Sequence, residues 1–190
     1  RRVRRGLGSI RQDLNVSISC GDRVEIKGCQ DLDWIPRIIR LEMARQLYFY
    51  RLANELRSEF SLPPLPPDRE SDSIPVENRV EVATKKRIPY STHDVTECFS
   101  ECDSEMVSSS LQNGSCVLGI SLPGFSGKIG KKTTDEKGSQ LPRLGRELAS
   151  AAKIAGVSGI FHSDELPAYG ISEAEVDSVR SQLSLSEDDA

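Results

Sequence analysis

The chain has 190 residues, a formal net charge of −4 at pH 7, a hydrophobic share of 37% and a charged share of 28%. These values are typical of a soluble globular protein with one large domain or two small ones. No stretch reaches the ~18 consecutive apolar residues of a membrane helix, and no apolar run near the N-terminus is typical of a signal peptide. We therefore expect a cytoplasmic protein with no membrane partner.

The first segment, residues 1–12, holds five Arg and no acid, whereas residues 163–190 hold eight acids and one Arg. A basic segment can bind phosphate because it releases condensed counterions. The simpler interpretation of residues 1–12 is a solvated strand end. The acidic C-terminal stretch cannot bind phosphate in this way and is typical of a solvent-facing segment.

Residues 9–27 predict a β-hairpin. Apolar and polar side chains alternate along residues 9–20, and a shorter alternation follows over residues 23–27, as in half-buried strands. Gly21-Asp22 supplies the turn, where Gly would provide a positive φ. The apolar faces pack inward, and the opposite face gathers Arg11, Asp13, Asn15, Glu25 and Lys27.

The polar face of this hairpin is the strongest chemical feature of the sequence. Carboxylates beside basic groups on rigid strands can hold a divalent cation and a polyphosphate, and Glu25 or Asp13 could serve as the Mg²⁺ ligand. Lys27 and Arg11 could neutralise the charge on a transferring phosphoryl group. The alternative is a surface network of cross-strand ion pairs, each worth ~0.2–1 kcal/mol, and residue chemistry leaves both interpretations open.

A long helix is expected next. Asp31 or Asp33 can cap its start, Pro36 suits its first turn, and apolar side chains recur at helical spacing as far as Phe60. We interpret the Arg and Glu residues of this helix as a solvated face. Four prolines within residues 63–67 then predict a stiff polyproline II spacer and a domain boundary, with an SH3-type ligand as the alternative.

The second half of the chain predicts one α/β unit. We expect strands over residues 76–83, 116–122 and 157–161, and helices over residues 94–99 and 143–155. Alternating strands and helices of this kind indicate an α/β or α+β sheet.

Turn and cap signals complete this unit. Asn113-Gly114 marks a turn, residues 123–138 are expected to form a mobile loop, and Ser172 with Glu175 forms a capping box that opens a last helix.

Shorter motifs are less informative. Residues 124–128 match only a short part of a phosphate-binding loop motif, and we interpret them as a flexible connector. His162 would stand at a strand end, where ligand contacts are common, although a hydrogen-bonded structural role is favoured. Cys98 and Cys102 lie near His93, but a zinc site needs about four ligands, and we favour buried, reduced thiols.

Two sets of stretches resemble known families. The first set resembles the E subunit of archaeal glutamyl-tRNA(Gln) amidotransferase, and a looser form of its hairpin occurs in the bacterial B subunit; it comprises residues 3–18, 23–28 and 30–32 and the pair Arg45-Gln46. The second set resembles the inserted module that the archaeal E subunit shares with bacterial-type aspartyl-tRNA synthetases; it comprises residues 92–97, 122–125 and 159–170.

This resemblance implies a domain organisation of the α+β class. Residues 1–60 would be part of a kinase or cradle domain with the hairpin and the long helix, and residues 61–70 a proline-rich linker. Residues 71–190 would be the small α/β inserted module, incomplete at its C-terminus. The chain opens at Arg1 without an initiating Met, so we expect an internal fragment. The resemblance implies further cradle residues and metal ligands outside it, so we expect the fragment to be inactive alone.

The resemblance also implies a reaction. The family uses ATP and Mg²⁺ to phosphorylate the side chain of Glu on tRNA(Gln), and ammonia from an asparaginase-like amidase, the D subunit, then gives Gln-tRNA(Gln) within a hetero-oligomer. The hairpin would line the active site, with Glu25 near the metal. Arg11, Asp13, Asn15 and Lys27 would contact phosphate or the aminoacyl end, and Arg11 and Lys27 would bind ATP.

Two other interpretations remain. The chain could be a non-catalytic RNA- or protein-binding α/β module, or a fragment of a bacterial-type aspartyl-tRNA synthetase. The hairpin argues against the latter, because the catalytic domain of that enzyme would show its own class II motifs.

Overall fold

The computed structural model describes residues 11–65, 67, 90–186 and 189. The chain divides into two compact units, the first formed by residues 1–87 and 133–141 and the second by residues 88–132 and 142–190. None of the helices in the described part of the chain is long and apolar enough to cross a membrane. The strand expected over residues 76–83 lies outside the described residues.

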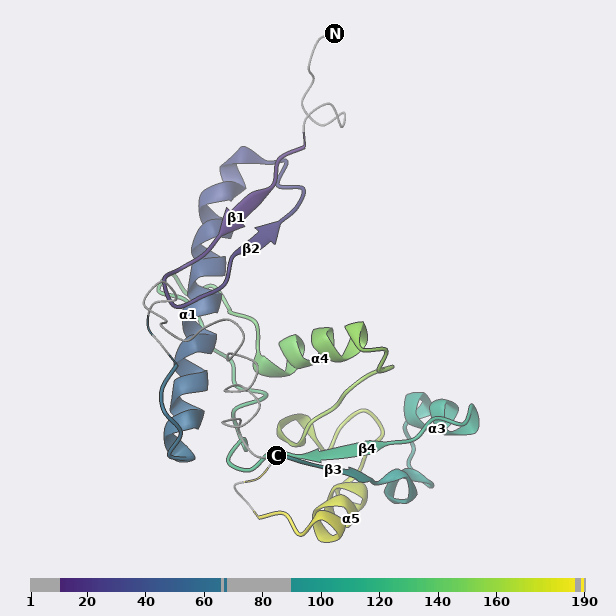
Figure 1. Cartoon of the computed structure of the whole chain (residues 1–190). Helices are drawn as coiled ribbons and strands as arrows, with labels where there is room; N and C mark the ends of the chain where they lie inside the picture. The colour runs from purple at the N-terminus through teal and green to yellow at the C-terminus, as the bar shows by residue number, and fades with distance from the viewer. Residues whose placement is uncertain (1–10, 66, 68–89, 187–188, 190) are drawn as a thin grey trace. The chain divides into compact units, whose positions relative to one another are not determined.

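The first unit begins with an antiparallel hairpin of β1 (Leu14–Val16) and β2 (Val24–Ile26), which lies along α1 (Figure 1). Leu14 pairs with Ile26, and Val16 pairs with Val24. These four residues share one face because side chains alternate along a strand. The predicted hairpin and its alternation are confirmed, although the paired strands are shorter than expected.

The hairpin turn differs from the prediction at Gly21. This residue does not adopt a positive φ; it closes a tight turn in which its N–H donates to the carbonyl oxygen of Ile18 at 2.9 Å. A Cβ at position 21 would lie 2.1 Å from Oε1 of Gln46. The missing Cβ of Gly21 therefore leaves room for the Gln46 side chain, and no left-handed backbone is needed here.

The long helix α1 spans Ile35–Glu59 and follows a 3₁₀-turn at Leu32–Trp34. The Asp31 side chain caps that turn by accepting from the N–H of Asp33. Pro36 sits in the first turn of α1, where a missing N–H is tolerated. The predicted helix is confirmed, but the predicted Asp cap belongs to the 3₁₀-turn before it, because the N-cap residue of α1 is Trp34 and makes no side-chain capping hydrogen bond.

The start of the proline-rich segment packs back against α1. The carbonyl oxygen of Pro63 accepts from Arg57 at 2.6 Å, and the N–H of Leu65 donates to Asn54 at 2.7 Å. Tyr50 donates its hydroxyl to the carbonyl oxygen of Leu65 at 3.1 Å. Residues 62–65 are thus held on the helix, and the role of residues 61–70 as a linker stays a prediction.

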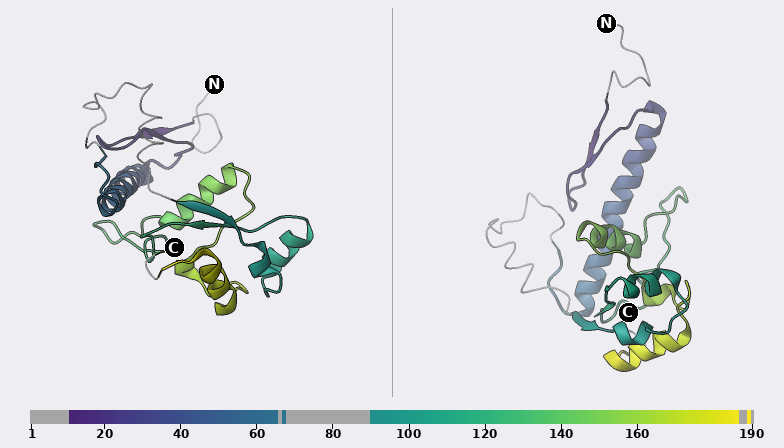
Figure 2. Two further views of the ribbon diagram at one scale, coloured as in Figure 1. Left: turned by 60° about the horizontal axis from the view of Figure 1, so that its bottom comes forward. Right: turned by 90° about the vertical axis from the view of Figure 1, so that its right-hand side faces the viewer.

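The second unit contains an antiparallel pair of strands, β3 (Ser91–Asp94) and β4 (Leu118–Ser121). Helices α4 and α5 lie on opposite sides of this pair (Figures 1 and 2). The helices of the unit are α3 (Glu105–Gln112), α4 (Leu144–Ile154) and α5 (Glu173–Leu183), with 3₁₀-turns at Thr96–Phe99 and Ser163–Glu165.

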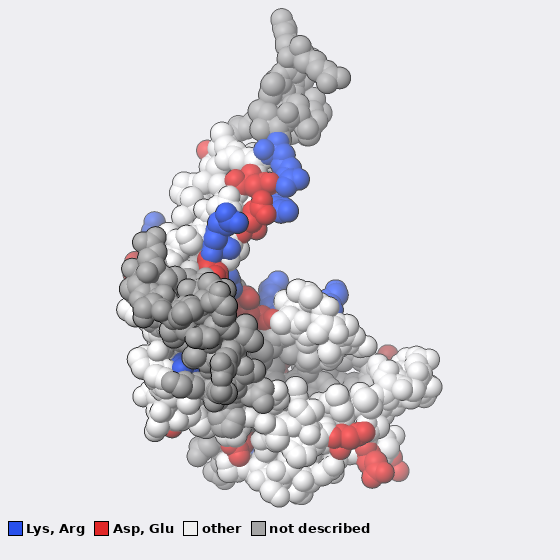
Figure 3. Space-filling model, in the orientation of Figure 1, with Lys and Arg blue, Asp and Glu red and all other residues white. Residues whose placement is uncertain are grey.

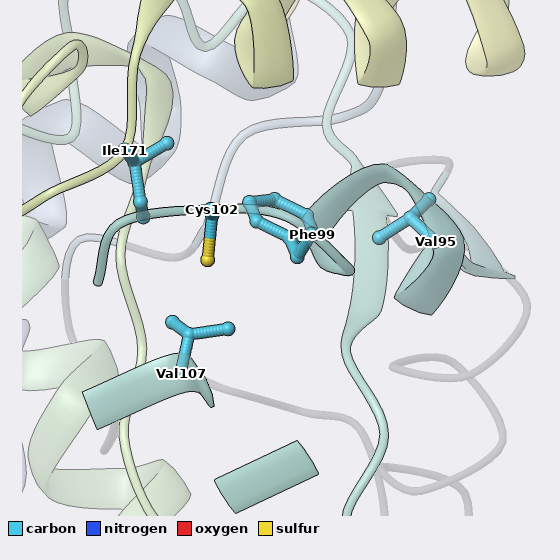
Figure 4. Packing of buried hydrophobic residues seen from close by; sticks show 5 residues of the cluster. All are labelled: Val95, Phe99, Cys102, Val107 and Ile171. Atoms are coloured by element: carbon cyan, nitrogen blue, oxygen red, sulfur yellow. The ribbon is translucent and has the colours of Figure 1, made fainter. Parts of the chain in front are cut away.

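The core of the second unit packs around η2, the 3₁₀-turn at Thr96–Phe99 (Figure 4). Phe99 lies with its ring centroid 5.5 Å from that of Phe161. The buried members of this core are Val95, Phe99, Cys102, Val107 and Ile171. The described residues form two small antiparallel sheets with separate helices, which confirms the α+β class.

Several local predictions for this unit were wrong. Residues 157–161 form no strand, and the N–H of Val157 instead donates to the carbonyl oxygen of Ala152 at the end of α4. The helix expected over residues 94–99 is a 3₁₀-turn, and the Asp94 side chain just before it accepts from the N–H of Thr96 at 2.9 Å. β3 and α3 were not predicted, because their polar sequences lack a clear apolar period.

Candidate functional site

The five residues singled out on the hairpin lie together in the first unit. Figure 3 shows basic and acidic side chains side by side over this region. Arg11 donates two hydrogen bonds to Oδ2 of Asp13, from Nε at 2.9 Å and from Nη2 at 2.7 Å. The N–H of Gly28 donates to Oδ1 of Asp13 at 2.9 Å, which connects the two arms of the hairpin.

Asn15 and Glu25 stand directly opposite each other across the strands. Lys27 places its Nζ 3.6 Å from Oε2 of Glu25, and the two side chains are 64% and 48% exposed. These contacts put both basic and both acidic groups on the solvent-facing side, opposite the apolar face. The predicted clustering therefore exists, while the roles of the individual residues stay predictions.

Electrostatics fix the charge states of the Arg11–Asp13 pair. The hydrogen bond from Arg11, followed by that from Gly28, holds the pKa of Asp13 below its ordinary value, and the positive charge of Lys27 acts in the same direction. The hydrogen bond with Asp13 raises the pKa of Arg11. Asp13 therefore holds Arg11 in one direction. Of the two carboxylates on this face, Glu25 has the weaker contact with other side chains, its 3.6 Å ion pair with Lys27.

The donor set suits a magnesium ion only in part. Mg²⁺ binds one or two carboxylates and keeps water and phosphate oxygens as its other ligands. Glu25 and the neighbouring Asn15 amide offer oxygens of this kind. Within residues 11–65, 67, 90–186 and 189, no group of three or more His, Cys, Asp and Glu side chains could hold a metal ion. The hairpin can therefore supply one or two ligands of such an ion, and water or phosphate oxygens or other protein groups would supply the rest.

Behind the hairpin, α1 contributes a buried polar network. The interpretation of its charged residues as a solvated face is wrong at Glu42, which is buried beside Gln46. Arg45 donates from Nε and Nη2 to the Glu42 carboxylate, each at 2.8 Å, and Gln46 donates to it at 2.9 Å. Burial raises the pKa of Glu42, but these hydrogen bonds outweigh it and leave the pKa below its ordinary value.

In the second unit, Asp164 holds the loop that contains residues 123–130. Its Oδ1 and Oδ2 accept from the N–H groups of Gly127 and Gly130, each at 2.7 Å. Phe125 and Ile129 of the same loop are buried. The expected mobile loop is therefore fixed over this part, and Asp164 has a structural role.

His162 lies beneath the start of α4, where a Cβ at Gly145 would come within 2.7 Å of its Nε2. The same nitrogen is 3.5 Å from Glu165, which also pairs with Arg143. No strand directly precedes His162, and its Nδ1 is buried without a hydrogen-bond partner among the described residues, so the packing indicates a structural role while the hydrogen-bonded one stays a prediction. Cys102 lies in the core, and the thiol of Cys98 contacts Gln182 at 3.1 Å.

Comparison with known proteins matches two successive stretches of the chain to known families. The family model described as the GatB/GatE catalytic domain matches residues 2–101, and the GAD domain model matches residues 107–190. The E subunit of glutamyl-tRNA(Gln) amidotransferase from Pyrococcus furiosus is 43% identical over 190 residues, which is 100% of this chain and 26% of the relative.

The proteins of the same name from Methanothermobacter thermautotrophicus and Haloarcula marismortui are 41% and 38% identical over 189 residues, and the match covers 100% of this chain and 25% of each relative. The chain thus spans about a quarter of the length of these relatives. Because the first family model matches more than half of its residues, the chain belongs to the GatB/GatE catalytic domain family.

Proposed function

We propose that this chain is part of a tRNA-dependent amidotransferase that converts Glu-tRNA(Gln) into Gln-tRNA(Gln). Family membership and the shared name of its relatives support this proposal. The structural observation that carries it is the exposed hairpin face, where Glu25 on β2 lies near Arg11 and Lys27, which flank the paired strands. We assign this face to the binding of ATP phosphates and Mg²⁺.

The proposed reaction has two steps. The side-chain carboxylate of the tRNA-bound glutamate attacks the γ-phosphorus of ATP, and ADP leaves, which gives an acyl phosphate. Ammonia then attacks the acyl carbon, phosphate leaves, and the nitrogen loses a proton to water to give the amide. Phosphorylation is needed because a carboxylate oxygen is a poor leaving group. We further propose that an asparaginase-like amidase partner supplies the ammonia within a hetero-oligomer.

The hairpin residues would act by charge and position. Arg11 and Lys27 neutralise negative charge on phosphate oxygens, which is the main protein contribution to phosphoryl transfer. Asp13 fixes the direction of Arg11 through the paired hydrogen bonds described above. Glu25 would supply a carboxylate ligand to Mg²⁺, whose charge would offset that of the phosphates, and Asn15 beside it would face the aminoacyl end.

The experiment uses the full-length protein with its partner amidase. Transfer of radiolabelled γ-phosphate from ATP to Glu-tRNA(Gln) is measured for wild type and Glu25→Ala. We expect the rate to fall about 100-fold or more, because a charge-stabilising group at the reacting phosphate is lost. Glu55→Ala, an exposed change on α1, is the matched control. Undiminished phosphate transfer in Glu25→Ala would remove the hairpin from the active site.

A further inference from the structure

We propose that Gln46 is a positioning residue that holds the hairpin face in its working geometry. The proposal rests on the function proposed for that face. Gln46 lies on α1, is only 7% exposed and points at the end of β1. It therefore has no access to substrate and would act through the hairpin backbone.

The side-chain amide of Gln46 binds a backbone carbonyl at the end of β1 and a backbone N–H two residues after it. Its Nε2 donates to the carbonyl oxygen of Val16 at 3.3 Å, and its Oε1 accepts from the N–H of Ile18 at 3.4 Å. Val16 directly follows Asn15, which pairs with Glu25. A shift of the Val16–Ile18 backbone would therefore displace the two residues that we place nearest to the metal and the aminoacyl end.

The direction of the amide is set by its neighbour on the helix. Glu42 accepts from Nε2 of Gln46 at 2.9 Å and is itself held by two hydrogen bonds from Arg45. An ionised carboxylate can only accept hydrogen bonds, so it keeps the amide nitrogen on its own side and leaves the amide oxygen for Ile18. The network thus specifies one orientation of Gln46 and one position of β1.

Gly21 shows how closely the hairpin is fitted to this amide. A Cβ at position 21 would lie 2.1 Å from Oε1 of Gln46. The backbone of Gly21 has no positive φ, so Gly21→Ala would not strain the turn but would push the amide away from Ile18. Gly21→Ala therefore disturbs the contact with Gln46 by a change in the hairpin instead of a change in Gln46 itself. It leaves every side chain of the polar face unchanged.

The test compares Gln46→Met and Gly21→Ala in the full-length protein with its partner amidase. Gln112→Met and Gly159→Ala, at exposed positions of the second unit, are the matched controls. We measure kcat and KM for ATP in the phosphate-transfer assay, and amide hydrogen exchange over residues 14–18 and along α1.

Both test variants should lower kcat about 10–100-fold, because a displacement near 1 Å is enough for such a loss. KM for ATP should change far less, exchange should rise over residues 14–18, and α1 should stay protected. Gly21→Ala keeps the test valid if Gln46→Met fails to fold, because its Cβ meets the flexible end of a side chain.

Two results would overturn the positioning role. One is faster exchange over residues 14–18 with kcat unchanged, since Gln46 would then stabilise the hairpin without affecting catalysis. The other is an effect on KM alone, which would indicate a loss of ground-state binding. Glu25→Ala in the same assay separates the two proposals: if it retains phosphate transfer, the proposed function of the face fails whatever Gln46 does.

Discussion

The buried network on α1 gives the sharpest stability prediction. Glu42→Ala removes the acceptor of two hydrogen bonds from Arg45 and one from Gln46. Hydrogen bonds to charged groups contribute ~1.5–3 kcal/mol each, and breaking a fully buried ion pair costs ~3–5 kcal/mol. The Arg45 side chain is 25% exposed and can turn to water, so we expect a loss of ~2–3 kcal/mol, below the fully buried range.

The single tryptophan of the chain provides the assay. Trp34 precedes α1 in the first unit, with the Arg37 guanidinium 5.3 Å from its ring centre. Its fluorescence during urea unfolding therefore reports on this unit, and the shift of the midpoint multiplied by the slope gives the change in the free energy of unfolding. Glu55→Ala is the control. A loss below ~0.5 kcal/mol for Glu42→Ala, the range of ordinary surface changes, would refute the reasoning.

Two further predictions concern pH and helix capping. The pKa of Glu42 lies below its ordinary value of 4.5 in the folded chain, so its stabilising contribution is present above pH 4.5 and is lost as the pH falls through the folded-state pKa. Urea midpoints from pH 7 down to pH 3 should fall less steeply in Glu42→Gln than in wild type, and equal slopes would contradict this. Ser172→Ala should destabilise α5 by ~1 kcal/mol, because Ser172 caps the helix and forms a capping box with Glu175. Circular dichroism during thermal unfolding measures this loss of stability, and the exposed change Ser158→Ala is the control.

Short-range patterns explain what could be predicted from the sequence. The alternation along residues 14–16 and 24–26 depends only on the period of a strand, so the hairpin and its polar face followed directly. The caps at Asp31 and Ser172 are equally local. The clustering of the hairpin residues needed only the register of two neighbouring strands.

The remaining features depend on contacts between distant residues. Glu42 was predicted to be solvent-facing, yet it is buried beside Gln46, whose side chain bonds to the hairpin 28 to 30 residues away along the chain. The strand expected over residues 157–161 has a β-prone sequence, but a strand requires a partner, and the strands formed by the described residues pair elsewhere. The spacing of Glu42 from Arg45 and Gln46 was a usable signal for a helix-surface network.

The clamp at Asp164 has a consequence for building chimeric proteins. The Asp164 carboxylate accepts from the backbone N–H groups of Gly127 and Gly130, although it lies 34 to 37 residues later in the chain. The shape of that loop is therefore encoded in two separate places. A graft that exchanges residues 123–130 with a homologue must also carry the matching residue at position 164, and swapping either part alone should leave the graft without its anchor.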